Sequence, residues 1–169
     1  MTGSAEGREP TVSDKLDEVL ALLRAGAGGV RAGPDGERFW ALEGLRGRVG
    51  EDGGVLMAGT VRLPGDLAYE WQQGSTTEAL LEADWSARAG ALDALAHPVR
   101  LLLVQHVLRG TTSTGELSRL EGVGTTGQLH HHLRQLVAVG WLRSTGRGRY
   151  EVPAPRVVPL LVLLLAAER

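Results

Sequence analysis

The sequence predicts an α+β fold, mostly helical, in which a small helix–helix–β-hairpin domain precedes a larger helical segment with a second hairpin. Apolar residues recur at helical spacing in several segments that open with a capping residue and close at glycine. Two capping boxes, Ser113-x-x-Glu116 and Thr125-x-x-Gln128, mark helix starts. Alternating apolar residues flank Pro64-Gly65-Asp66, whose Pro-Gly order is typical of a type II turn and therefore indicates a hairpin.

The composition is that of a folded protein of one domain or two small ones. Its 169 residues are 43% hydrophobic and 22% charged. The absence of cysteine excludes a disulfide framework, a thiolate zinc site, an iron–sulfur cluster and a Cys nucleophile. The first residues lack the features of a secretory signal, and the longest apolar run, 157–167, is shorter than the roughly 20 residues of a membrane span. We expect a cytoplasmic protein with no membrane partner and no cofactor.

The N-terminal part is predicted to be a dimerisation or regulatory domain over residues 13–75, after a disordered tail over 1–12. A first helix begins at Ser13 and a second spans 37–49, with a Gly-rich loop over 25–36 between them. Strands are expected over 55–63 and 67–73, followed by a short helix over 77–83. Trp40, Tyr69 and Trp71 form a candidate ligand pocket, although such aromatic residues more often form the core of a small domain.

The C-terminal part is predicted to contain four helices and a hairpin. The helices span 84–96, 98–109, 113–120 and 125–139, and the hairpin pairs 141–143 with 150–152. Pro98 suits the first turn of its helix, and Gly140 ends the last one. Residues 86–156 carry 9 basic against 4 acidic residues, whereas residues 1–85 carry 8 against 15. This asymmetry suggests that the basic part meets a polyanion, although scattered surface charge would give the same counts.

A short helix, a glycine turn, a longer helix and an arginine-tipped hairpin follow one another in the order of a winged helix-turn-helix, over residues 84–155. In the helix over 125–139, Leu129, Leu133 and Leu136 recur at helical spacing and should pack inward. The outward residues have groups that bond phosphates or base edges, and the hairpin arginines could reach the backbone or a minor groove. The predicted DNA-binding residues are Thr125, Thr126, Gly127, Gln128, His130, His131, Arg134, Arg143, Arg147 and Arg149.

Two segments carry a family resemblance. The run from Leu92 to Leu101 reads LDALAHPVRL, and the run from Thr126 to Leu142 reads TGQLHHHLRQLVAVGWL. Together they resemble the arsenic-repressor (ArsR-type) winged-helix transcriptional regulators over about residues 85–155. The resemblance implies a homodimer whose recognition helices, 125–139, enter successive major grooves of double-stranded DNA, with Arg147–Arg149 as the wing. The chain departs from the family in having no Cys-rich metal-sensing helix and in carrying about 85 residues ahead of the motif, in which we identify no effector domain.

The same residues bear on three other interpretations: a metal site, an enzyme and a protein-interaction adaptor. Consecutive helical residues point about 100° apart, so His130, His131 and His132 cannot converge on one metal ion. His132 is expected to be packed or to touch phosphate. No paired carboxylates or phosphate loop suggest an enzyme. A protein-interaction adaptor that uses the winged helix and the acidic N-terminal domain is the alternative to DNA binding.

The segment over 156–169 is predicted to be an apolar helix used for dimerisation. Its residues Val157–Ala167 are apolar nearly all round, so the helix must be buried between subunits or against the N-terminal domain. A second candidate for the dimer interface is the stripe of Leu16, Val19, Leu20 and Leu23. Both features favour an obligate homodimer.

Overall fold

The computed structural model describes residues 39–168, and the chain divides into two compact units, Met1–Arg48 and Val49–Arg169. The tail expected over 1–12, the helix from Ser13 and the loop over 25–36 lie outside the described residues. In the first unit, α3 (Trp40–Arg46) is shorter than the helix expected over 37–49. None of its residues is buried, and Trp40 is 60% exposed.

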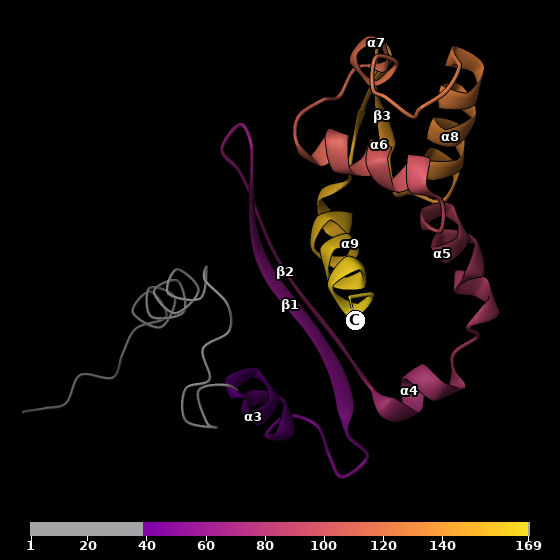
Figure 1. Ribbon diagram of the computed structural model, residues 1–169. Coiled ribbons are helices and arrows are strands. Elements are labelled where there is room, and N and C mark those ends of the chain that lie inside the picture. The colour runs from indigo at the N-terminus through magenta and orange to yellow at the C-terminus, as the bar shows by residue number, and fades with distance from the viewer. Residues whose placement is uncertain (1–38, 169) are drawn as a thin grey trace, which may run out of the picture. The chain divides into compact units, whose positions relative to one another are not determined.

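The second unit is α+β and mostly helical, which agrees with the predicted fold class at this coarse level (Figure 1). Its elements, in chain order, are β1 (Gly54–Leu63), β2 (Leu67–Thr76), α4 (Thr77–Glu82), the 3₁₀ turn η1 (Ser86–Arg88), α5 (Ala89–Leu95), α6 (Pro98–Leu108), α7 (Thr114–Leu117), α8 (Thr126–Ala138), β3 (Arg143–Gly146), β4 (Arg149–Glu151) and α9 (Ala154–Ala166). Each pair of strands forms a separate antiparallel hairpin. None of the described helices is long and apolar enough to cross a bilayer.

The first hairpin forms at the predicted turn and is longer than expected. Leu63 pairs with Leu67 across Pro64-Gly65-Asp66, and β2 continues to Thr76 rather than ending at Gln73. Gly65 has the positive φ (83°) that a type II turn requires, and Asp66 adds a second left-handed residue (φ 57°). Because short polar side chains tolerate this conformation better than most, the loop closes over three residues.

One face of this hairpin is covered by α9. Val61 pairs with Tyr69 and Gly59 with Trp71, so these four residues share a face. A Cβ at Gly59 would lie 2.8 Å from Cγ1 of Val158 on α9, so the glycine lets the helix approach the sheet closely. The hairpin therefore belongs to the same unit as the C-terminal elements, whereas we expected it to form a domain with residues 13–48.

The first half of the C-terminal helix α9 packs inside its own unit, against the first hairpin. Its first half is buried within the unit through Val157, Val158 and Leu160, each at most 1% exposed. Its last turn is different, because Leu164 and Leu165 are 42% and 67% exposed. Burial within one chain therefore accounts for half of the apolar helix, and only its end presents an open apolar surface.

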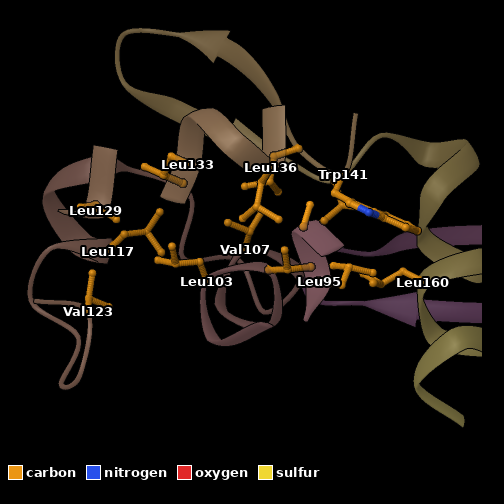
Figure 2. Close-up of a cluster of buried hydrophobic side chains, with 14 of the residues drawn as sticks. Leu95, Leu103, Val107, Leu117, Val123, Leu129, Leu133, Leu136, Trp141 and Leu160 are labelled. Atoms are coloured by element: carbon orange, nitrogen blue, oxygen red, sulfur yellow. The ribbon is translucent and has the colours of Figure 1, made fainter. Parts of the chain in front are cut away.

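The core gathers where α8 packs on α6, α7 and α5 (Figure 2). Leu129, Leu133 and Leu136 of α8 are fully buried, as their spacing predicts, and lie toward Leu117 and Leu103. The apolar residues of this cluster with at most 5% exposure in α5–α8 are Ala94, Leu103, Val104, Val107, Leu117, Leu129, Leu133 and Leu136. The buried face of α8 thus fixes which of its faces is left to solvent.

Three predicted boundaries differ from the structure. The expected helix over 84–96 is replaced by η1 and α5, because Oδ1 of Asp84 accepts hydrogen bonds from the Ser86 N–H (2.9 Å) and hydroxyl (2.7 Å) and tightens the first turn. α7 ends at Leu117 rather than at 120. The strands of the second hairpin lie closer to its turn than the predicted ranges 141–143 and 150–152: Trp141 and Leu142, expected in the first strand, precede β3 and are buried in the core.

Candidate nucleic-acid interface

The start of α8 is fixed by the predicted capping box. The Oγ1 of Thr125 accepts a hydrogen bond from the Gln128 N–H (3.3 Å), and Oε1 of Gln128 accepts one from the Thr125 N–H (2.7 Å). Gly124 has a φ of 82°, and a Cβ there would lie 2.3 Å from Oε1 of Gln128. The turn before α8 therefore requires glycine. The remaining free N–H groups of the first turn lie at an exposed helix end, which favours negative charge.

The polar face of α8 is exposed along its length. The predicted outward residues Thr126, Gly127, Gln128, His130, His131 and Arg134 are all exposed, as is Thr125. Among residues 39–168, Arg134 makes only a long hydrogen bond (3.4 Å) from its Nε to the His130 carbonyl, so its other guanidinium donors have no partner in this part of the chain. This face lies opposite the buried leucines and contains no acidic residue.

The capping box alters the role that Gln128 can have. Bidentate hydrogen bonding of a glutamine to adenine uses both the amide oxygen and the amide nitrogen of the side chain. The oxygen already accepts the Thr125 N–H, whereas the nitrogen has no partner among the described residues. In this conformation the amide nitrogen of Gln128 can donate hydrogen bonds to a base edge or a phosphate, and its amide oxygen keeps one lone pair that can accept another.

The second hairpin presents its arginines in three different states. Arg143 is paired with the Glu151 carboxylate, and Arg149 donates to Oγ1 of Thr112 (3.0 Å). Arg147 makes no hydrogen bond or ion pair with the described residues. It lies in the two-residue turn with Gly148, where both residues have positive φ (51° and 69°), as a type I′ turn requires. Arg147 is therefore the hairpin arginine with every donor available.

This hairpin is tied to the start of α7. The carbonyl of Gly148 accepts hydrogen bonds from both the N–H and the Oγ1 of Thr114 (2.8 Å each), and the Tyr150 N–H donates to the Thr112 carbonyl (2.9 Å). In Figure 1 α7 and the first turn of α8 lie at the same end of the unit. The bonds from Thr114 thus hold the Arg147 turn at the end where α8 begins.

His132 faces inward, unlike its two histidine neighbours. Its ring centroid lies 4.7 Å from that of His97, and its Nδ1 is buried with no hydrogen-bond partner within the described part of the chain. Burial, together with the nearby His97, His131 and Arg100, lowers the pKa of His132 below its ordinary value. His97 itself caps α6, because its Nδ1 accepts the Val99 N–H (3.1 Å). These two histidines therefore belong to the packing behind α8.

Arg100 is a structural residue that the sequence interpretation missed. Arg100 is only 7% exposed. Its guanidinium donates hydrogen bonds to the carbonyls of Ala94 (2.6 Å) and Asp93 (2.6 Å) at the end of α5 and to Oε1 of Gln135 on α8. It thus joins three helices and holds the orientation of α8. A single arginine inside the apolar run of α6 was the signal, since a buried cation needs partners. Arg119, exposed directly after α7, is a further basic candidate that we did not select.

The three residues of the candidate aromatic pocket are divided between the two units, with Tyr69 and Trp71 on the first hairpin. Tyr69 packs against the core, Trp71 is 36% exposed on the hairpin, and Trp40 belongs to the other unit. A hollow of about 550 Å³ lies instead between α6, α9 and the tip of the first hairpin, and none of the three aromatics lines it. Among residues 39–168, no group of three or more His, Asp or Glu side chains is placed to hold a metal ion.

Comparisons with protein-family models, curated protein sequences and solved structures gave no match for this chain. The resemblance to ArsR-type regulators therefore rests on the residues of the two motif segments alone.

Proposed function

We propose that the chain is a homodimeric, sequence-specific DNA-binding transcriptional regulator of the winged-helix type. In this proposal α8 enters the major groove and the β3–β4 hairpin is the wing, which contacts the backbone or the minor groove. The observation that carries the proposal is the division of α8 into two faces, one with three fully buried leucines and one that is exposed, polar and free of acidic side chains.

The size and chemistry of the exposed face suit a duplex. An α-helix fits the major groove of B-DNA, and Arg and His side chains bond base edges or phosphates there. The capped first turn of α8 has free N–H groups that can bind a phosphate oxygen. Arg147 supports the same reading, because a free guanidinium at a tight turn can reach a phosphate without breaking an existing bond.

The test begins with selection of bound fragments from random duplexes by the purified full-length protein. Anisotropy of a labelled selected duplex then gives the affinity between 50 and 200 mM salt. Four to eight phosphate contacts per dimer predict that log K falls against log [salt] with a slope of about −4 to −7. Binding to no duplex at any ionic strength would contradict the proposal, and an affinity for a protein partner that barely responds to salt would favour the adaptor.

Two variants separate positioning from base reading. Arg147→Asn removes the wing charge with a residue that tolerates positive φ, and should weaken binding to all sequences alike and reduce the salt slope by about 1 per subunit. Arg134→Ala should instead relax the base preference. Arg62→Ala is the matched control, because Arg62 is exposed on β1 and makes no bond to the described residues.

A further inference from the structure

A hollow of the second unit lies away from α8, and its lining is almost wholly apolar. It has a volume of about 550 Å³, within the range of about 300–1,000 Å³ of small-molecule sites. Ten of its twelve lining residues are Leu, Val or Pro, contributed by α6, by α9 and by Leu63 and Pro64 at the hairpin tip. Water in such a space finds few hydrogen-bond partners, which favours an apolar occupant.

The helix α6 is apolar on two sides, and only one of them is fully buried in the described part of the chain. Leu103 and Val107 are buried toward α8, at 0% and 5% exposure. Leu101, Leu102 and Leu108 lie on the other side, are half-buried and line the hollow. A helix that is apolar all round is normally buried all round, so the side facing the hollow calls for a further apolar group.

Two polar residues lie at the same hollow without partners. Gln105 and Arg109 are one helical turn apart on α6, and both are exposed. Neither side chain makes a hydrogen bond or ion pair with the described residues, and no acidic residue lines the hollow. Free donors and one positive charge beside an apolar surface complement a molecule with an apolar body and an anionic end.

We propose that this hollow binds a small amphipathic anion, of the chemical class of a medium-chain carboxylate. The alkyl chain lies among the leucines of α6 and α9, and the carboxylate accepts hydrogen bonds from Arg109 and Gln105. Since α6 packs against α8 through Leu103 and holds Gln135 through Arg100, an occupant is placed to shift α8. That last consequence rests on the proposed function of α8, whereas the binding itself does not.

The first experiment is calorimetric titration of the full-length protein with sodium dodecanoate below its micelle concentration, in the absence of DNA. We expect one site per chain. From hexanoate to dodecanoate the affinity should rise by up to about fourfold per methylene group. Dodecyltrimethylammonium, which has the same chain and the opposite charge, should bind at least tenfold more weakly. Absence of dodecanoate binding, or equal binding of the two surfactants, would overturn the proposal.

Paired variants locate the site. Leu164 lines the hollow and Leu165 does not, so Leu164→Trp should abolish binding while Leu165→Trp leaves it unchanged. Arg109→Gln should weaken dodecanoate about three- to tenfold, and Arg119→Gln should have no effect. Equal losses within either pair would place the ligand elsewhere.

Sedimentation equilibrium separates a ligand from a second copy of the chain as the occupant. If Leu164→Trp dissociates a dimer and the unmodified protein takes up no dodecanoate, the hollow is a subunit interface and the proposal is wrong. Repeating the duplex titration with dodecanoate tests the coupling to α8. An unchanged DNA affinity would refute the coupling alone, and failure of all DNA binding would leave the calorimetric result standing.

Discussion

Replacing Gln128 by Glu separates the stability of α8 from its ability to approach DNA. The carboxylate can accept the Thr125 N–H as the amide oxygen does now. Glu116 already does this in the corresponding position of α7, where the hydroxyl and the N–H of Ser113 lower the pKa of its carboxyl group. The new side chain should therefore keep the cap and stay ionised. Negative charge in the first turn of a helix contributes about 0.3–1 kcal/mol, so the free energy of unfolding should be unchanged or slightly higher.

The same charge should weaken DNA binding. A carboxylate about 6 Å from a phosphate is repelled by about 0.7 kcal/mol in water-like surroundings. Two neighbouring phosphates give about 1.4 kcal/mol, or about a tenfold loss of affinity per half-site. The loss should shrink as salt screens the charges.

Urea unfolding followed by tryptophan fluorescence and duplex binding followed by anisotropy measure the two effects. Gln72→Glu, which adds the same charge at an exposed position of β2, is the control. It should leave the free energy of unfolding unchanged and change the affinity for the duplex by no more than twofold. If Gln128→Glu binds the duplex as tightly as the unmodified protein, the start of α8 does not face phosphates. A loss of more than about 1 kcal/mol in stability would instead contradict the capping geometry.

Three further predictions concern stability. Arg100→Met should lower the free energy of unfolding by about 3 kcal/mol or more in urea melts, because carbonyls of α5 and the Gln135 amide oxygen lose a charged donor. An unchanged urea midpoint would show that Arg100 does not hold α5, α6 and α8 together. Because the pKa of His132 is lowered in the fold, the unfolded chain binds more protons, and the free energy of unfolding should fall as the pH drops below about 6.5. His132→Leu should make the free energy of unfolding less dependent on pH, and an identical pH profile in the variant would contradict the role of His132. Gly59→Ala should cost about 1–2 kcal/mol against Val158, whereas Gly90→Ala, with open space in α5, should add about 0.5–1 kcal/mol; equal effects on the thermal midpoint would contradict the packing of α9.

Local signals in the sequence predicted local structure well. Ser113 with Glu116 and Thr125 with Gln128 form the capping boxes that their spacing indicates. The stripe of leucines on α8 is buried as its period of 3.6 predicts. These features depend on residues within one or two helical turns, so the neighbouring sequence is sufficient to specify them.

Features that depend on distant partners could not be predicted in the same way. Arg100 reaches Gln135, 35 positions later, and α9 meets the hairpin at Gly59, almost 100 positions earlier. Local patterns contain no information on these pairings, so the hairpin was grouped with residues 13–48, and the choice between a subunit interface and the N-terminal domain was left open for α9.

The central claim, that the polar face of α8 lies against a duplex, can be tested with a single reactive position. The chain has no cysteine, so His131→Cys introduces a unique thiol on that face, to which an iron–EDTA cleavage reagent can be attached. On a selected duplex we predict strand cleavage confined to a few nucleotides in each half-site. The same reagent on Arg62→Cys should give no such cuts. No localised cleavage from position 131, or the same pattern from both positions, would contradict the placement of α8 on DNA.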